Sequence, residues 1–244
     1  KNIIIMKSVL IIGSNGNVGK YLFKKLKKNK FCVKGTTSKT SNTKDIIKIN
    51  YKNTKLLKKI IKKFDCVIYC ASESKFESCE KKTVKSKFLN VELITGILNI
   101  MNNKQKIIYF SSLGVKYKFK NKPIYIKQKE YIEKKIVEKL KNYFILRTSK
   151  IIDTINLYKY KKIYLDQKIS ITNLEIVFKS VLKILRRNLK GEANIASRNK
   201  ITYFKLAKDK FKIKNINKAY SYQNNKFHFY EPEKYNLNKN FKFA

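Results

Sequence analysis

Ser112, Tyr125 and Lys129 have the residue types and the spacing for proton transfer at a carbonyl group. Tyr125 and Lys129 are four residues apart, so in a helix both side chains lie on one face, one turn apart. An ammonium group there can lower the pKa of the phenol, while the Ser112 hydroxyl hydrogen-bonds a substrate carbonyl. The three residues therefore form a candidate catalytic set with Tyr125 as the acid or base.

The Tyr-x-x-x-Lys spacing is not specific by itself in a chain so rich in lysine. It also occurs at Tyr21, Tyr51 and Tyr158. Position distinguishes Tyr125, which follows Ser112 by 13 residues and begins a predicted helix. The structural alternative is that Tyr125 is only an aromatic residue at a helix start and Ser112 only a polar residue at a strand end.

A second motif, Gly-Ser-Asn-Gly-Asn-Val-Gly at 13–19, predicts a dinucleotide-binding site. It lies between an apolar run at 9–12, typical of a buried strand, and an amphipathic stretch typical of a helix. Gly13 permits a tight turn, Gly16 lets the backbone approach a pyrophosphate, and Gly19 lets the helix pack close to the strand. Free N–H groups at the helix start favour phosphate binding. A plain glycine loop is the alternative, but the chain has only 7 glycines.

The residues after the second predicted strand, 31–35, indicate which dinucleotide binds. In NAD enzymes of this fold, a carboxylate at that point holds the ribose 2′-hydroxyl. This chain has Thr36, Thr37, Ser38 and Lys39 instead, which are three hydroxyls and a cation suited to a 2′-phosphate. The pattern predicts NADP, with NAD less favoured; a solvated loop is the alternative interpretation.

Strands and helices alternate along most of the chain, which predicts an α/β fold. The expected architecture is a Rossmann-like, doubly wound parallel sheet with ligands at the carboxyl ends of its strands and a small C-terminal substrate lobe. The predicted strands are 9–12, 31–35, 46–49, 65–72, 106–112 and 143–147, and the predicted helices are 18–26, 56–64, 84–101 and 124–140.

Two units are predicted. Residues 6–150 are the NAD(P)-binding Rossmann domain, and residues 151–244 are a reduced substrate-binding lobe that partly contributes to the sheet. In the lobe, the pattern indicates strands at 169–172 and 193–196 and helices at 177–185 and 203–211. The one histidine, His228, has no evident partner and is interpreted as structural.

The net charge of +42 makes nucleic acid the first partner to consider. All but four of the 58 basic residues are lysine, and they are spread over every predicted helix rather than clustered. Arginines, which fork onto bases and phosphates, are nearly missing. Frequent lysine, isoleucine and asparagine are typical of an AT-rich genome. We expect weak, salt-sensitive adsorption to polyanions and no specific nucleic-acid binding.

The apolar run near the N-terminus is interrupted by Lys7 and too short to cross a membrane. It also lacks the layout of a signal peptide, and Met6 is a candidate first residue, with 1–5 as an upstream extension. The four cysteines are Cys32, Cys66, Cys70 and Cys79. They include no C-x-x-C pair and no neighbouring histidine. We therefore expect free thiols, no metal site and a cytoplasmic protein.

Several segments, in this order and spacing, resemble the extended short-chain dehydrogenase/reductase family. The resemblance is closest to its nucleotide-sugar epimerases and dTDP-4-dehydrorhamnose reductases. The matching segments are GSNGNVG (13–19), DCVIYCAS (65–72), NVELITGILN (90–99), IIYFSSLGV (107–115), YIKQKEYIE (125–133), ILRTS (145–149), NIAS (194–197) and ITYFKLA (201–207). They run nearly from end to end of the chain, and it is their order that is specific.

The resemblance implies roles for residues at matching positions. Ser112 would polarise the substrate carbonyl, Tyr125 would be the acid/base, and Lys129 would hold the nicotinamide ribose. Asn50 stands where the family usually has an adenine-contacting aspartate, and residues 71–72 would line the nicotinamide side. The implied cofactor-binding set is Gly13, Gly16, Asn17, Val18, Gly19, Thr36, Thr37, Ser38, Lys39, Asn50, Ala71, Ser72, Tyr125 and Lys129.

The resemblance also implies an NAD(P)-dependent reductase or epimerase acting on a sugar carbonyl, with a nucleotide sugar as substrate, in surface-polysaccharide synthesis. Two departures concern the substrate: the segment between Ser112 and Tyr125 is short, and 152–172 is brief for a substrate-binding helix. A trimmed lobe favours the alternative, a non-catalytic NADP(H)-binding redox sensor. Family members commonly pair two helices of each subunit, which implies a homodimer through 84–101 and 124–140.

Overall fold

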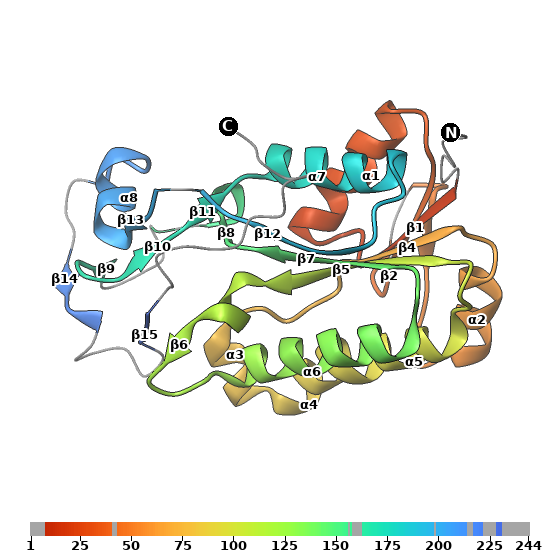
Figure 1. Cartoon of the computed structure of the whole chain (residues 1–244), viewed down its shortest axis with the longest axis horizontal. Coiled ribbons are helices and arrows are strands. Elements are labelled where there is room, and N and C mark those ends of the chain that lie inside the picture. Colours follow the sequence, from red (N-terminus) through yellow and green to blue (C-terminus); the bar gives the residue numbers. More distant parts are fainter. Residues whose placement is uncertain are drawn as a thin grey trace.

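Seven parallel strands form the central sheet of the computed structural model, in the order β12-β7-β5-β4-β1-β2-β3 (Figure 1). They are β1 (Ser8–Ile12), β2 (Cys32–Thr37), β3 (Ile46–Lys48), β4 (Cys66–Tyr69), β5 (Lys106–Ser112), β7 (Tyr143–Thr148) and β12 (Gly191–Ile195). The structure describes residues 8–40, 43–155, 157, 163–197, 199–213, 217–221 and 228–230.

The strand order reverses at β1. β2 and β3 lie on one side of it, and β4, β5, β7 and β12 lie on the other. All neighbouring pairs are parallel, so their carboxyl ends share one edge of the sheet. In such sheets the ligand crevice opens at that edge, where the order reverses. The predicted Rossmann-like, doubly wound fold is confirmed.

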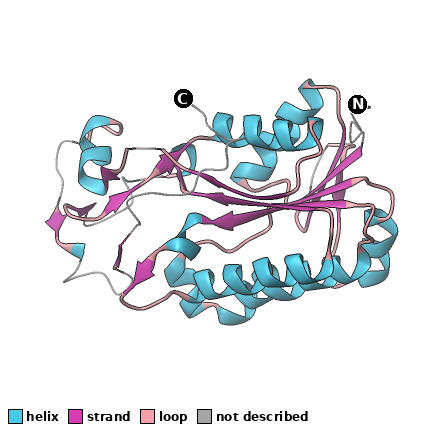
Figure 2. Ribbon diagram, in the orientation of Figure 1, coloured by secondary structure: helices cyan, strands magenta, loops and turns pink. Residues whose placement is uncertain are grey.

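Helices cover both faces of the sheet (Figure 2). α1 (Asn17–Lys28) and α7 (Leu174–Arg186) lie on one face. α2 (Thr54–Ile61), α5 (Leu93–Ile100) and α6 (Ile124–Lys139) lie on the other. Each helix buries one apolar stripe against the sheet, because its apolar residues recur at helical spacing.

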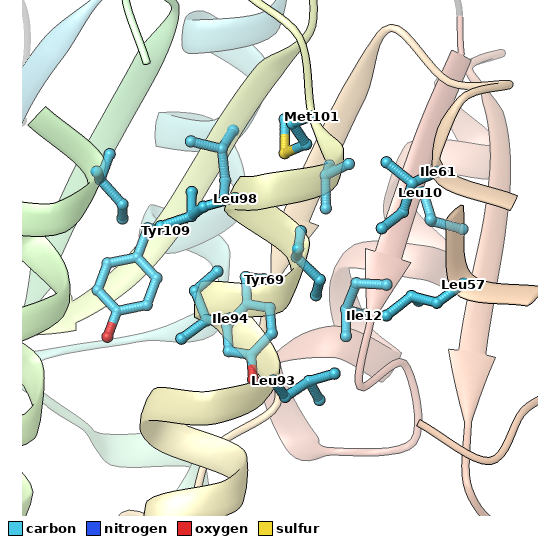
Figure 3. Close-up of a cluster of buried hydrophobic side chains, with 14 of the residues drawn as sticks. Leu10, Ile12, Leu57, Ile61, Tyr69, Leu93, Ile94, Leu98, Met101 and Tyr109 are labelled. Carbon is cyan, nitrogen blue, oxygen red and sulfur yellow. The ribbon is translucent and has the colours of Figure 1, made fainter. Parts of the chain in front are cut away.

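β1 shows how the sheet divides the core in two. Val9 and Ile11 point toward the layer of α1 and α7, whereas Leu10 and Ile12 point toward α2 and α5, since successive strand residues alternate between faces. All four are fully buried, which explains an apolar run without alternation. Figure 3 shows the second layer, where Leu10 and Ile12 join Leu57 of α2. Each such side chain contributes about 1.5–3 kcal/mol through burial.

The long helix predicted over 84–101 is interrupted. The chain forms α3 (Phe76–Lys81), α4 (Thr83–Lys87), a π-helical turn at Phe88–Glu92, and then α5. The wide turn includes Asn90, which is 1% exposed and fully hydrogen-bonded at the centre of the site described below. Such turns inside α-helices are frequent at functional sites.

A small lobe lies beyond the carboxyl edge of the sheet (Figure 1). Its elements are β8 (Lys150–Ile151), β9 (Ile163–Tyr164), β10 (Lys168–Ile169), β11 (Ile171–Thr172), β13 (Ile201–Thr202), α8 (Tyr203–Asp209), β14 (Lys218–Ala219) and β15 (Phe229–Tyr230). β15 pairs antiparallel with β6 (Lys118–Phe119), which lies between Ser112 and Tyr125. The lobe is therefore tied to the loop that joins two candidate catalytic residues.

His228 lies in this lobe, and the expectation that it has no partner is wrong. Its Nδ1 lies 2.8 Å from the hydroxyl of Ser221, which donates to Asp166 at 2.9 Å. The three side chains join segments that are far apart in the sequence, which a local pattern does not reveal.

Some expectations fall on residues outside the described ranges. They include Met6, the pair Tyr158 and Lys162, and most of the chain after 215. Within the described residues, no helix is both long enough and apolar enough to span a membrane.

Candidate active site

The glycine-rich loop follows β1 at the carboxyl edge of the sheet. Gly13 has a φ of +85°, and a Cβ there would lie 2.7 Å from the backbone nitrogen of Ala71. A Cβ on Gly19 would lie 2.3 Å from the Gly13 carbonyl oxygen, because α1 packs directly on the loop. A Cβ on Gly16 would meet only that same oxygen, at 3.5 Å. Folding requires glycine at 13 and 19, whereas Gly16 keeps the surface in front of the loop open.

α1 begins directly after Gly16, and no described side chain caps its first turn. The first N–H groups of a helix have no partner within the helix, and the helix dipole adds partial positive charge. Asn17, which is exposed, and Val18, which is half-buried, lie in this first turn. The surface that a side chain at Gly16 would fill therefore fits the diphosphate of a dinucleotide.

β2 runs two residues beyond the predicted 31–35, and this changes the role of Thr36. Thr36 is fully buried, and its hydroxyl lies 2.9 Å from that of Tyr51. Its carbonyl oxygen accepts both the backbone N–H and the hydroxyl of Ser14, each at 3.0 Å. The expectation that Thr36 offers its hydroxyl to a cofactor is wrong, because this residue fastens the glycine loop to β2.

Ser38, Lys39 and Asn50 are the exposed members of the predicted cofactor set at this corner. Thr37 is 4% exposed, and its hydroxyl accepts the backbone N–H of Lys39 at 3.1 Å, which shapes the turn after β2. Asn50 accepts the N–H of Lys52 at 3.0 Å through its side-chain oxygen. Of the four residues predicted to hold a 2′-phosphate, only Ser38 and Lys39 are exposed.

β5 and α6 carry the predicted catalytic residues. Ser112 ends β5, pairs with Thr148 of β7 and accepts the N–H of Gly114 at 3.1 Å. The chain crosses through β6 and returns as α6, where Tyr125 lies in the first turn. The Tyr125 hydroxyl faces Ser72, which follows β4.

Lys129 lies one helical turn beyond Tyr125 and is 2% exposed. Its Nζ donates to the carbonyl oxygen of Phe110 at 2.8 Å. The same atom lies 4.7 Å from the ring centre of Tyr109 and 5.4 Å from that of Tyr125. The structure thus brings Tyr125, which is half-buried, and the buried Lys129 together on one face of α6, as their spacing predicts.

The sequence profile of the NAD-dependent epimerase/dehydratase family matches residues 9–169, well over half of the chain. The chain belongs to this family. It is an NAD(P)-dependent enzyme of the extended short-chain dehydrogenase/reductase type. A search among curated protein sequences finds no significant match.

Solved structures share the fold of this epimerase/dehydratase-family protein. The dTDP-4-dehydrorhamnose reductase of Clostridium acetobutylicum gives a TM-score of 0.75 over 91% of this chain and 87% of its own, at 18% identity. The dTDP-4-dehydrorhamnose reductase of Bacillus anthracis, solved with NADP, gives 0.72 over 90% and 86%, at 19% identity. MoeE5, solved with UDP-glucuronic acid and NAD, gives 0.71 over 87% and 85%, at 14% identity. At these identities the likeness establishes the fold alone.

The charge states of Tyr125 and Lys129 follow from their surroundings in the fold. Burial raises the pKa of the Tyr125 phenol, the nearby Cys79 raises it further, and the facing Ser72 hydroxyl opposes the rise. Burial also lowers the pKa of Lys129 to about 8. Lys129 is not among the groups that shift this pKa here, so the expected lowering of the Tyr125 pKa by Lys129 stays a prediction. Tyr125 is a protonated phenol at neutral pH and is suited to donate a proton.

Asn90 is a site residue that the sequence analysis missed. Its Oδ1 accepts the Ser72 hydroxyl at 2.8 Å and the Glu73 N–H at 3.0 Å. Its Nδ2 donates to Gln128, the neighbour of Lys129, at 2.7 Å. Asn90 thus fixes the segment after β4 to α6. The sequence feature that could have indicated this role is that Asn90 is a polar residue on the apolar side of the predicted helix 84–101.

A buried ion network behind Lys129 was also missed. Arg147 of β7 donates through Nε to both carboxylate oxygens of Glu133, at 2.9 and 3.0 Å, and through Nη2 at 2.6 Å. Nη2 also donates to Glu192 of β12 at 2.6 Å. The side chains of Arg147 and Glu133 are 6% and 11% exposed. The sequence feature that could have indicated this network is the position of Glu133, four residues after Lys129 and so on the same helical face.

The copy of the Tyr-x-x-x-Lys spacing at Tyr21 lies elsewhere. The hydroxyl of Tyr21 and the Nζ of Lys25 both donate to Glu175, at 2.6 and 2.8 Å. These contacts join α1 to α7 at the surface of the molecule. Position in the fold, rather than spacing, distinguishes Tyr125.

Proposed function

We propose that this protein is an NADP(H)-dependent reductase or epimerase that acts on the carbonyl of a nucleotide sugar, in surface-polysaccharide synthesis. The observation that carries the proposal is the environment of Tyr125. Its protonated hydroxyl faces Ser72, Lys129 lies beside its ring, and Ser112 ends the strand that precedes α6. Residues 6–150 bind the cofactor and residues 151–244 supply the substrate lobe.

In this mechanism the chain polarises and protonates a carbonyl oxygen. Ser112 donates a hydrogen bond to that oxygen, and Tyr125 transfers its proton to it as negative charge develops. Lys129 holds the nicotinamide ribose. A bound nicotinamide supplies or accepts the hydride. The protonated phenol is the form that can donate the proton in carbonyl reduction.

A row of aromatic rings packs from Tyr125 into the lobe, and Phe76 and Phe119 are half-exposed members of it. Ring centres are 5.9 Å apart for Tyr125 and Phe76, 6.2 Å for Phe76 and Phe119, and 5.5 Å for Phe119 and Phe229. The Lys150 ammonium lies 5.8 Å from the Phe76 ring centre. Aromatic faces with a cation beside them suit sugar and base rings that carry phosphates. MoeE5, which shares the fold, was solved with UDP-glucuronic acid.

Replacing Tyr125 by phenylalanine tests the mechanism. Because the hydroxyl acts in the transition state, Tyr125→Phe is expected to lower kcat by about 10²–10⁴-fold with nearly unchanged NADPH affinity. Turnover is measured as loss of NADPH absorbance with a panel of 4-keto nucleotide sugars. Tyr131→Phe, on the exposed side of the same helix, is the matched control.

Two outcomes contradict this proposal in different ways. Full turnover by Tyr125→Phe means that the proton comes from another group. Tight NADPH binding by a wild type that turns over no sugar in the panel instead supports the redox-sensor alternative.

The choice of NADP rests on Ser38 and Lys39, the exposed donors at the end of β2. We expect NADPH to bind more tightly than NADH, and Lys39→Ala to weaken NADPH binding about tenfold while leaving NADH binding unchanged. Fluorescence titration with both cofactors measures this, with Lys24→Ala, an exposed lysine of α1, as the control. Equal or tighter binding of NADH by the wild type overturns the preference.

A further inference from the structure

Lys129 and Glu133 share the buried face of α6 but are not bonded to each other. They are four residues apart, and both are buried, together with Ile126, Ile132 and Ile136. The Lys129 ammonium points to the Phe110 carbonyl, at 2.8 Å. The Glu133 carboxylate instead takes three hydrogen bonds from Arg147.

The clamp by Arg147 explains this separation. A buried ammonium and a carboxylate one helical turn apart attract each other strongly in a low-dielectric interior. A bidentate guanidinium fixes the carboxylate in position and angle, because both of its oxygens are engaged. Arg147 is itself held from its other side by Glu192. Glu133 therefore stays on the Arg147 side, and the ammonium keeps its direction toward Phe110 and Tyr125.

The other groups around Lys129 carry no charge at neutral pH. The titratable groups that face it are Tyr125 and Glu133 of α6, Tyr109 of β5, Cys70 after β4 and Cys79 of α3. Burial raises the pKa of both tyrosines. It also raises the pKa of Cys70 to about 12 and the pKa of Cys79 to about 11. Among these described groups, Glu133 is the anion.

We propose that Glu133, clamped by Arg147, is a positioning residue that keeps the buried Lys129 ammonium charged and directed at the active-site carbonyl of Phe110. The proposal rests on the proposed function, in which Lys129 holds the nicotinamide ribose. In this proposal Glu133 is a counter-ion that acts on Lys129 through space, from a position one helical turn further along α6.

The test measures the titration of Lys129 directly, without cofactor. Protein labelled with carbon-13 at the lysine ε position is titrated by NMR, and the Lys129 signal is assigned from its loss in Lys129→Met. Glu133→Gln is expected to lower the titration midpoint of Lys129 by about one pH unit or more, because a facing negative charge is removed. Arg147 keeps Glu192 as a partner in this variant.

Lys106 provides an internal control in the same spectra. It is also fully buried, and burial lowers its pKa to about 8, but it faces Cys66 and Lys190 rather than Glu133. Its midpoint is expected to stay constant in Glu133→Gln. Two further variants complete the set: Glu133→Asp, which keeps the charge, is expected to restore the midpoint of Lys129, and Glu138→Gln, at an exposed glutamate of α6, leaves it unchanged.

A functional measurement separates this inference from the proposed function. The fall of NADPH affinity on the alkaline side is expected to move to lower pH in Glu133→Gln by the same amount as the NMR midpoint. A Lys129 midpoint that is unchanged in Glu133→Gln, or that falls together with that of Lys106, overturns the inference. A shifted midpoint in a protein that binds no NADPH supports the coupling and overturns the proposed function.

Discussion

At the scale of single residues, the three glycines of the cofactor loop are glycine for different physical reasons. Gly13 adopts a positive φ and touches Ala71, and Gly19 lets α1 rest on the Gly13 carbonyl. Gly16 has a φ of −73°, and a Cβ there would make only an ordinary contact, with the Gly13 carbonyl oxygen at 3.5 Å. The first two therefore serve the fold, and the third serves what binds in front of the loop.

This difference predicts opposite phenotypes for two substitutions. Gly16→Val is expected to leave the free energy of unfolding within about 0.5 kcal/mol, the usual effect of an exposed change, and to abolish NADPH binding. Gly19→Ala is expected to cost about 3 kcal/mol, because its Cβ would press on backbone rather than on a movable side chain. Urea denaturation and NADPH fluorescence measure the two effects. Unchanged NADPH affinity in Gly16→Val would show that the loop is not the cofactor site.

At the scale of elements, β5 connects two buried cations at opposite ends of the sheet. Lys106 begins the strand, and its Nζ donates to the Leu189 carbonyl after α7, at 2.8 Å. Near the other end, the Phe110 carbonyl receives Lys129. One strand thus fastens α7 at the amino edge of the sheet and α6 at the carboxyl edge.

The burial of Lys106 predicts a pH-dependent stability. Its pKa is lowered from 10.5 to about 8, so between these values the unfolded chain binds more protons than the folded one. Its contribution to the free energy of unfolding therefore rises with pH across that window. Lys106→Met lacks this titrating group. As the pH is raised from about 8 to 10.5, the variant is therefore expected to lose stability relative to the wild type by on the order of 1–3 kcal/mol. Urea denaturation at both ends of the window measures it, with exposed Lys104→Met as control; a pH-independent difference contradicts it.

At the scale of the whole molecule, net charge and exposed apolar surface have opposite effects on the association of two copies of the chain. A net charge of +42 makes copies of the chain repel each other. The large apolar side chains that are exposed among the described residues are Leu56, Val84, Tyr131, Val137 and Tyr220. Val84, in α4, and Tyr131 and Val137, in α6, lie on the helices predicted to pair in a homodimer.

We therefore predict a homodimer that is strengthened by moderate salt, which screens the repulsion between lysines. Tyr131→Lys combined with Val137→Lys is expected to give a monomer by light scattering, because both changes bury charge in the predicted interface. Leu56→Lys, on α2, is the matched control and is expected to remain dimeric. A monomeric wild type at moderate salt contradicts the prediction.

Local patterns were sufficient for the framework of this protein. The apolar runs of β1, β4 and β5, the helical stripes of α1 and α7, and the glycine loop between β1 and α1 are all set by neighbours in the sequence. Periodicity reports which face of an element is buried, and the order of elements then restricts the sheet to a doubly wound topology. The joint placement of Tyr125 and Lys129 follows in the same way, because both belong to one helix.

The remaining features depended on which residues, distant along the chain, come to face each other. Thr36 turns inward because Tyr51 and Ser14 bond to it, and Asn90 is buried because Ser72 and Gln128 surround it. The pairing of Glu133 with Arg147 is equally a product of packing α6 on β7. Such buried polar contacts are determined by the tertiary structure, since the cost of an unpartnered buried group selects its partner only after the elements have packed.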